Sequence, residues 1–164
     1  MFGLFSRKNE PLQLEGTVTI LAPAETIFAL VDFASPANRL AARGFRFSEK
    51  AQKTGRFAAT NPDMPEIAFE FDVDLYEAPA VYGFASRIIA ETPFGAFVRG
   101  REEYHIEQLD NNRCRVTLKT KNWWRDGLSG RTRRNEEAVM MQAVGNDLAK
   151  LKIEAEGLVA RSAA

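Results

Sequence analysis

The sequence predicts an α+β chain: an antiparallel sheet of about seven strands, two short helices after the first strand and a long C-terminal helix. Two observations support this class. Apolar and polar residues alternate in most segments between residues 12 and 124, and a 3.6-residue apolar period replaces the alternation near the C-terminus. Because only one face of each long strand is apolar, we expect the helix to cover that face and solvent to cover the other.

The long helix is predicted over residues 135–158. Its apolar residues recur at steps of three and four and form one stripe: Met140, Val144, Leu148, Leu151, Ala155 and Leu158. Such a helix would measure roughly 36 Å, at about 1.5 Å per residue. The strand predicted over residues 67–77 reaches about the same length at ~3.3 Å per residue. The polar residues 125–134 are interpreted as a connector.

The N-terminal part predicts one strand and two short helices. Residues 12–21 alternate as a strand, and Pro23 then begins a short apolar helix. Ser35 and Pro36 repeat the helix start signal, and the second helix should end at Gly44.

From Phe45 onward the apolar period is two, which predicts a series of strands separated by turns. These strands are predicted over residues 45–50, 56–60, 67–77, 81–91, 96–109 and 114–124. Asp110, Asn111 and Asn112 are typical of a hairpin turn, because Asn and Asp tolerate the backbone of tight turns.

Composition excludes several functional classes. The 164 residues include 22 Lys+Arg and 22 Asp+Glu, so the net charge is zero and no nucleic-acid partner is expected. No run approaches the ~20 apolar residues of a membrane span, so stable membrane insertion is not expected. Cys114 and His105 are the only residues of their types, which argues against a disulfide within the chain and a Cys/His metal site. We expect a cytoplasmic protein without metal or cofactor, and the oligomeric state stays open.

The chain divides into three parts on this interpretation. Residues 12–158 form a single domain, residues 1–11 a flexible N-terminal tail and residues 159–164 a C-terminal tail. Phe2, Leu4 and Phe5 could contact a membrane or a partner, although termini usually stay loose unless they dock.

The element order and one short segment resemble a known superfamily. In residues 22–28 (APAETIF) a strand passes into a helix through a proline, and a long helix closes the chain. Over about residues 12–157 the sequence resembles the START-type helix-grip superfamily, which contains lipid-transfer domains, polyketide cyclases and plant pathogenesis-related allergens. The resemblance implies a curved sheet wrapped around the C-terminal helix, with a hydrophobic tunnel between them. It implies no active residue, because proteins with one fold perform different functions.

The candidate ligand-binding residues are those in the inward phases of the strands and on the long helix. They are Phe69, Phe71, Val73, Phe84, Ser86, Ile88, Val98, Glu102, Tyr104, Val116, Leu118, Asn122, Met140, Met141 and Val144. Twelve Phe, and methionines beside Gly145, suit a pocket that can adapt to an apolar guest. A solid core made from the same residues is the alternative.

Glu102 is the most informative single position and the one candidate for catalysis. It falls in the inward phase between Gly100 and Tyr104. Burial of a carboxylate there costs free energy unless the group is hydrogen-bonded, paired with a cation or hydrated. It could hold a ligand hydroxyl or act as an acid/base with a raised pKa, and Asn122, Ser86 and Tyr104 are the nearest neutral residues that could share a site with it. Alternatively, a bulge turns Glu102 outward, or Glu102 lies at the solvent-exposed entrance of the tunnel.

Other charged residues have simpler interpretations. The outward phases of three adjacent strands carry Glu70, Asp72, Asp74, Arg87, Arg99 and Arg101. Alternate strand positions lie about 6.6 Å apart, so the three carboxylates cannot all reach one metal ion, and the arginines could balance them. His105 is interpreted as a surface residue and Cys114 as a small buried one.

An arginine-rich segment adjoins two tryptophans. It contains Trp123, Trp124, Arg125, Arg131, Arg133 and Arg134. Such a group could contact phosphates or lipid headgroups, or Glu136 and Glu137 could balance it.

Three functions are compatible with these observations. The pattern favours a non-enzymatic protein that binds, transports or senses a small hydrophobic or lipid-like molecule. The second hypothesis is a cyclase/dehydratase-type enzyme in which Glu102, with Tyr104 or Asn122, polarises or deprotonates a carbonyl compound. The third is a protein-interaction module that docks through the arginine-rich segment or residues 2–5.

Overall fold

The computed structural model describes residues 10–50, 54–90 and 95–164. Within these ranges, seven strands and three helices follow one another in the predicted order. They are β1 (Leu12–Ile20), α1 (Ala24–Val31), α2 (Arg39–Ala42), β2 (Arg46–Glu49), β3 (Arg56–Thr60), β4 (Ala68–Glu77), β5 (Val81–Ile89), β6 (Phe97–Asp110), β7 (Arg113–Trp124) and α3 (Gly130–Ser162). The predicted α+β class is confirmed. The predicted role of residues 2–5 lies outside the described residues.

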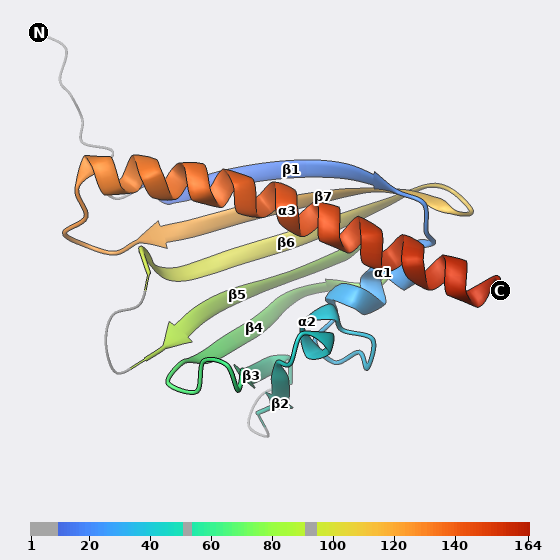
Figure 1. The fold of residues 1–164 in the computed structure, drawn as a ribbon, viewed down its shortest axis with the longest axis horizontal. Helices are drawn as coiled ribbons and strands as arrows, with labels where there is room; N and C mark the ends of the chain where they lie inside the picture. Colours follow the sequence, from blue (N-terminus) through green and yellow to red (C-terminus); the bar gives the residue numbers. More distant parts are fainter. Residues whose placement is uncertain (1–9, 51–53, 91–94) are drawn as a thin grey trace, which may run out of the picture.

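All described strands join one antiparallel sheet in the order β1-β7-β6-β5-β4-β3-β2. The first strand lies beside the last, with Leu12 opposite Asn122 and Ile20 opposite Cys114. Figure 1 shows the sheet curving beneath α3, which runs across one of its faces, with α1 and α2 on the same side. The arrangement gives the sheet an inner face that meets the helices and an outer face that does not.

Helix α3 is longer than predicted at both ends. It begins at Gly130, because the side chain of Ser129 accepts a hydrogen bond from the backbone N–H of Thr132 at 3.0 Å and so caps the first turn. The predicted connector over residues 125–134 is therefore wrong beyond Ser129. Residues 159–162, expected in a C-terminal tail, continue the helix. No helix in the described ranges combines the length and apolar character that crossing a membrane requires.

The middle of the predicted apolar stripe attaches α3 to the sheet. Val144, Leu148, Leu151 and Ala155 are buried, and Leu148 and Val144 meet β1 at Gly16. A Cβ on Gly16 would lie 2.9 Å from a methyl carbon of each. The absence of a side chain at this position lets the helix approach the first strand closely.

Replacing Gly16 by alanine should lower the free energy of unfolding by about 1–2 kcal/mol, because Leu148 and Val144 must move to admit the added carbon. Urea denaturation measures the change. Gly145→Ala is the matched control on α3, where a Cβ would meet no atom within 4 Å. It should raise stability by about 0.5–1 kcal/mol through helix propensity. Equal responses of the two variants would contradict the close packing at Gly16.

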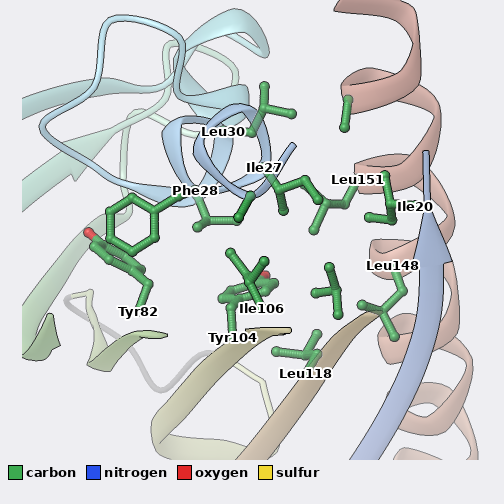
Figure 2. Packing of buried hydrophobic residues seen from close by; sticks show 14 of the residues in the cluster. Ile20, Ile27, Phe28, Leu30, Tyr82, Tyr104, Ile106, Leu118, Leu148 and Leu151 are labelled. Carbon is green, nitrogen blue, oxygen red and sulfur yellow. The ribbon is translucent and has the colours of Figure 1, made fainter. Parts of the chain in front are cut away.

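The core fills the space between α1, α3 and the centre of the sheet. Figure 2 shows side chains of α1, including Ile27 and Phe28, meeting Leu151 of α3 and Tyr82 of the sheet. The hydroxyl of Tyr82 is satisfied because it accepts a hydrogen bond from the backbone N–H of Phe33 at 2.9 Å. Burial raises the pKa of Tyr82 well above its usual range, so this hydroxyl stays neutral. Cys114 is buried, as predicted.

A register shift in β4 reverses the predicted faces at its end. The shift lies between Val73 and Leu75. Beyond it, Tyr76 shares the face of Tyr82, with ring centroids 5.9 Å apart, although the alternation predicted Tyr76 outside. Leu75, predicted inside, instead packs over Gly83, where a Cβ would come within 3.0 Å of Leu75 Cβ. One extra residue inverts the alternation, which the apolar period does not reveal.

A second shift changes the start of β6. It lies between Phe97 and Arg99, so that Phe97 pairs with Trp124 and their ring centroids are 4.6 Å apart. The alternation predicted Val98 on the inner face, but Val98 is 52% exposed. The prediction for Val98 is therefore wrong, because the irregularity removes it from the inward phase.

Helix α2 begins later than predicted. Ser35 and Pro36 lie in turns, and the helix follows Asn38, whose side-chain oxygen accepts a hydrogen bond from the backbone N–H of Leu40 at 2.9 Å. Asn38 is the actual cap. The chain leaves the helix at Gly44 with φ of +92°, as the glycine predicted.

Ion pairs cover the outer face of the sheet, as expected for a solvated charged surface. They join Glu70 to Lys50 and Arg87, Asp72 to Arg56, Asp74 to Arg101, and Glu103 to Arg101. His105 forms a hydrogen bond with Glu103 on the same face. The predicted balancing of this face by Arg87 and Arg101 is confirmed. Arg99 instead lies over the ring of Trp123, 4.1 Å from its centroid.

Candidate functional site

A cavity of about 310 Å³ lies between the inner face of the sheet and the helices. Residues of α1, α2, β4, β5, β6 and α3 surround it, so every layer of the fold contributes to its wall. The apolar lining residues are Leu30, Val31, Phe33, Leu40, Phe45, Phe69, Phe71, Phe84 and Ile88. The volume is at the lower end of the range typical of small-molecule sites, about 300–1,000 Å³.

A polar cluster interrupts this apolar wall where α2, α3 and β6 meet. Arg39, which is 6% exposed, donates through Nη2 to Asp147 Oδ2 at 2.5 Å and to the Tyr104 hydroxyl at 2.8 Å. Its Nη1 donates to the backbone carbonyl of Asp147 at 3.2 Å. The Tyr104 hydroxyl in turn donates to Asp147 Oδ2 at 2.8 Å. The cluster joins the short helix after the first strand to the middle of α3.

The cluster fixes the charges of its members. Burial opposes the charge of Arg39, but Tyr104 and the Asp147 carboxylate outweigh it and raise the pKa of Arg39 above its usual range. Burial raises the pKa of Tyr104 well above its ordinary value, so the phenol stays neutral. The result is a salt bridge between a buried arginine and a half-buried aspartate, with the neutral Tyr104 hydroxyl in contact with both.

Glu102 lies beside this cluster and lines the cavity. It is opposite Phe84 on one neighbouring strand and Thr120 on the other, in regular register, so the alternative in which a bulge turns it outward is wrong. Burial raises the pKa of Glu102 to about 7, and the charge of Asp147 adds to this effect. Its carboxyl oxygen is 3.5 Å from the Tyr104 hydroxyl, a long distance for a hydrogen bond. Near neutral pH this carboxyl can therefore donate or accept a proton.

Solved structures with the same architecture cover most of this chain. Ara h 8.0201 has a TM-score of 0.63 and 11% identity, over 92% of this chain and 99% of that chain. A START superfamily protein from Mycobacterium smegmatis has a TM-score of 0.58 and 14% identity, over 91% of this chain and 97% of that chain. This chain has the START-type helix-grip fold. At these identities the likeness establishes the helix-grip fold alone.

A third structure shows the same fold inside a longer chain. DynU16, a protein in the dynemicin biosynthetic locus, has a TM-score of 0.55 and 15% identity, over 85% of this chain and 45% of that chain. No protein-family model matches the sequence, and no curated protein matches it. The chain therefore shares its fold, but little of its sequence, with these structural neighbours.

The helix-grip cavity brings together seven of the residues proposed to bind a ligand. They are Phe69, Phe71, Phe84, Ser86, Ile88, Glu102 and Tyr104. All seven come from β4, β5 and β6, whose regular alternation places them on the inner face. Their role in binding a ligand stays a prediction.

The structure places the remaining candidates elsewhere. Val116, Leu118 and Val144 belong to the solid core, and Val73 lines a separate hollow beside Tyr76 and Tyr82. Asn122, Met140, Met141 and Val98 are not among the residues that line the cavity. Met141 is 60% exposed, because it lies on the solvent side of α3 and not on the buried stripe. The helix therefore does not present its methionines to the cavity.

Arg39 and Asp147 were not among the residues that the sequence predicted for the site. Asp147 had a signal, since it falls three residues after Val144 and four before Leu151, within the buried stripe of α3. Arg39 directly follows the cap Asn38 in an otherwise apolar short helix. Neither signal indicates that the two residues meet, because they are separated by 108 positions.

One arginine of the arginine-rich segment and two cations from β6 and β7 lie over the two tryptophans. Arg99 and Lys121 lie over Trp123, and Arg133 lies over Trp124 at 5.3 Å from the ring centroid. These contacts are cation–π interactions at the protein surface. The predicted balancing of the segment by Glu136 and Glu137 stays a prediction.

Proposed function

We propose that this chain binds a small hydrophobic or lipid-like molecule in the cavity, as a carrier or a sensor. The supporting observation is a cavity of about 310 Å³ whose wall is rich in phenylalanine and holds one carboxyl group, Glu102, outside the Arg39–Asp147 pair. An apolar guest would remove both its own surface and that of the rings from water, which is favourable by about 25 cal/mol per Å². A cytoplasmic setting belongs to the same proposal, since a single cysteine suits a reducing compartment.

Displacement of an uncharged fluorescent reporter, N-phenyl-1-naphthylamine, tests this proposal. The unmodified chain should bind the reporter, and Ser86→Phe should weaken binding at least about tenfold by occupying the cavity. Ile89→Phe is the matched control on the same strand, because Ile89 is 45% exposed and is not among the cavity residues. It should bind the reporter as the unmodified chain does. Absence of reporter binding, with no molecule retained in native mass spectra, would reject the proposal.

An enzyme of the cyclase/dehydratase type is the second candidate. Its supporting observation is the pKa of about 7 at Glu102, which suits general acid/base catalysis near neutral pH. In this candidate Glu102 removes a proton from, or polarises, a bound carbonyl compound, and Tyr104 lies next to it. Glu102→Gln should then abolish turnover while it spares binding. A variant that retains turnover would exclude this role.

A further inference from the structure

The inner face beside the cavity carries a compact polar patch on three adjacent strands. One row consists of Ser86, Gly100 and Asn122, and the next contains Glu102 opposite Thr120. Ser86 and Asn122 both reach over Gly100, where a Cβ would come within 2.9 Å of Ser86 Oγ and 3.0 Å of Asn122 Oδ1. Of this patch, Ser86 and Glu102 line the cavity, whose wall is otherwise rich in aromatic residues, and Asn122 and Thr120 lie beside it on the next strand.

The hydrogen-bonding capacity of this patch is only partly used. Among the described residues, Thr120 Oγ1 and Asn122 Nδ2 are buried without a hydrogen-bond partner, and Thr120 is only 7% exposed. Glu102 makes one long contact, with Tyr104, whose hydroxyl has a shorter contact of 2.8 Å with Asp147. Buried polar groups are normally satisfied, and an unsatisfied group costs about 1–3 kcal/mol. Thr120 and Asn122 do not line the cavity, so Glu102, which does and has only a long contact with Tyr104, is the group that a polar atom of a ligand can reach.

We infer that the ligand of this cavity is an uncharged apolar molecule bearing a hydroxyl group, an alcohol or a phenol, whose hydroxyl meets Glu102. This inference rests on the proposed function. A hydroxyl is both donor and acceptor, so it complements the carboxyl of Glu102 in either protonation state. The apolar body then lies against Phe69 and Phe71, which line the same cavity.

The charges around the cavity discriminate against a carboxylate ligand. Such a ligand would meet two carboxyl groups, Glu102 and Asp147. The buried cation nearby is Arg39, and its Nη2 already donates to Asp147 and Tyr104. Arg87 also lines the cavity but forms an ion pair with Glu70. A carboxylate would therefore lose water without gaining a free cationic partner, which is unfavourable.

Three probes with the same ring system test the inference on the unmodified full chain. Naphthalene, 2-naphthol and 2-naphthoate are compared at pH 7 by displacement of N-phenyl-1-naphthylamine. We expect 2-naphthol to bind about tenfold more tightly than naphthalene, as one hydrogen bond predicts, and 2-naphthoate to bind more weakly than either. Equal affinity for naphthalene and 2-naphthol, or tightest binding of 2-naphthoate, would overturn the inference.

Two variants connect the selectivity to the patch. Glu102→Leu should reduce the preference for 2-naphthol over naphthalene to within about threefold while naphthalene still binds. Glu103→Leu, which changes the neighbouring carboxylate on the outer face, should keep the full preference. Persistence of the preference in Glu102→Leu would contradict the assignment.

The outcomes separate the inference from the proposed function. If the reporter and naphthalene bind but 2-naphthol has no advantage, the cavity binds ligands and the hydroxyl selectivity is wrong. If neither the reporter nor any probe binds, both the inference and the proposed function are wrong. The ligand comparison uses the unmodified chain, so it decides the inference even where a variant does not fold.

Discussion

Replacing Arg39 by methionine should lower the free energy of unfolding by about 3 kcal/mol, at the lower end for a broken buried ion pair. The guanidinium is 6% exposed and holds Asp147 and the Tyr104 hydroxyl at 2.5 and 2.8 Å. Without it, the Asp147 carboxylate would stay next to Tyr104 and Glu102 with its positive partner removed. Asp147 is 28% exposed, and because water can reach its carboxylate the decrease in the free energy of unfolding is limited. Urea denaturation at pH 7 measures the change.

Arg43→Met is the matched control for this prediction. Arg43, which directly follows α2, pairs with Glu154 of α3 at 2.6 Å, but the two side chains are 33% and 31% exposed. An exposed pair contributes less than about 1 kcal/mol. The double variant Arg39→Met/Asp147→Leu should be more stable than Arg39→Met alone, because no charge remains unpaired. Similar losses for Arg39→Met and Arg43→Met would show that the cluster does not stabilise the fold.

Replacing Glu102 by glutamine should stabilise the protein at pH 8 and leave its stability nearly unchanged at pH 4.5. The fold raises the pKa of Glu102 from 4.5 to about 7, so it favours the protonated form. That contribution is fully present below pH 4.5 and is lost as the pH rises through 7. At 1.36 kcal/mol per pH unit the difference is about 3 kcal/mol, and water in the cavity should reduce it to about 2 kcal/mol. Glutamine imitates the protonated form at every pH.

Glu103→Gln is the control for pH dependence, since Glu103 is the next residue but faces the outer ion pairs. Burial opposes the charge of Glu103, but Arg101 and His105 outweigh it and lower its pKa. Replacing the Glu103 carboxylate by an amide should therefore not raise the free energy of unfolding at pH 8. Chemical denaturation at pH 4.5, 6 and 8 compares the two variants with the unmodified chain. If Glu102→Gln and the unmodified chain had the same stability at pH 8, the fold would not raise the pKa of Glu102.

Some elements of this fold could be predicted from the sequence and some residues could not, and the difference has a physical reason. Strands β4 to β7 and α3 were predictable because the apolar period within one segment reports which face is buried. The inward position of Glu102 follows from the same period. Val98 and Tyr76 were misplaced because register shifts interrupt the alternation at single residues. The exposed Met141 shows that methionine content does not indicate which side of a helix meets a cavity.

By itself, the sequence determined the element order, the fold class and the presence of one carboxyl among inward-facing aromatic residues. These properties depend on neighbours within a few positions, where backbone geometry dictates side-chain direction. Only the tertiary structure decided that Arg39 and Asp147, 108 positions apart, form an ion pair beside Glu102, and that the pKa of Glu102 is about 7. A pKa depends on the solvent and charge that surround a group, and distant segments supply both when the chain folds.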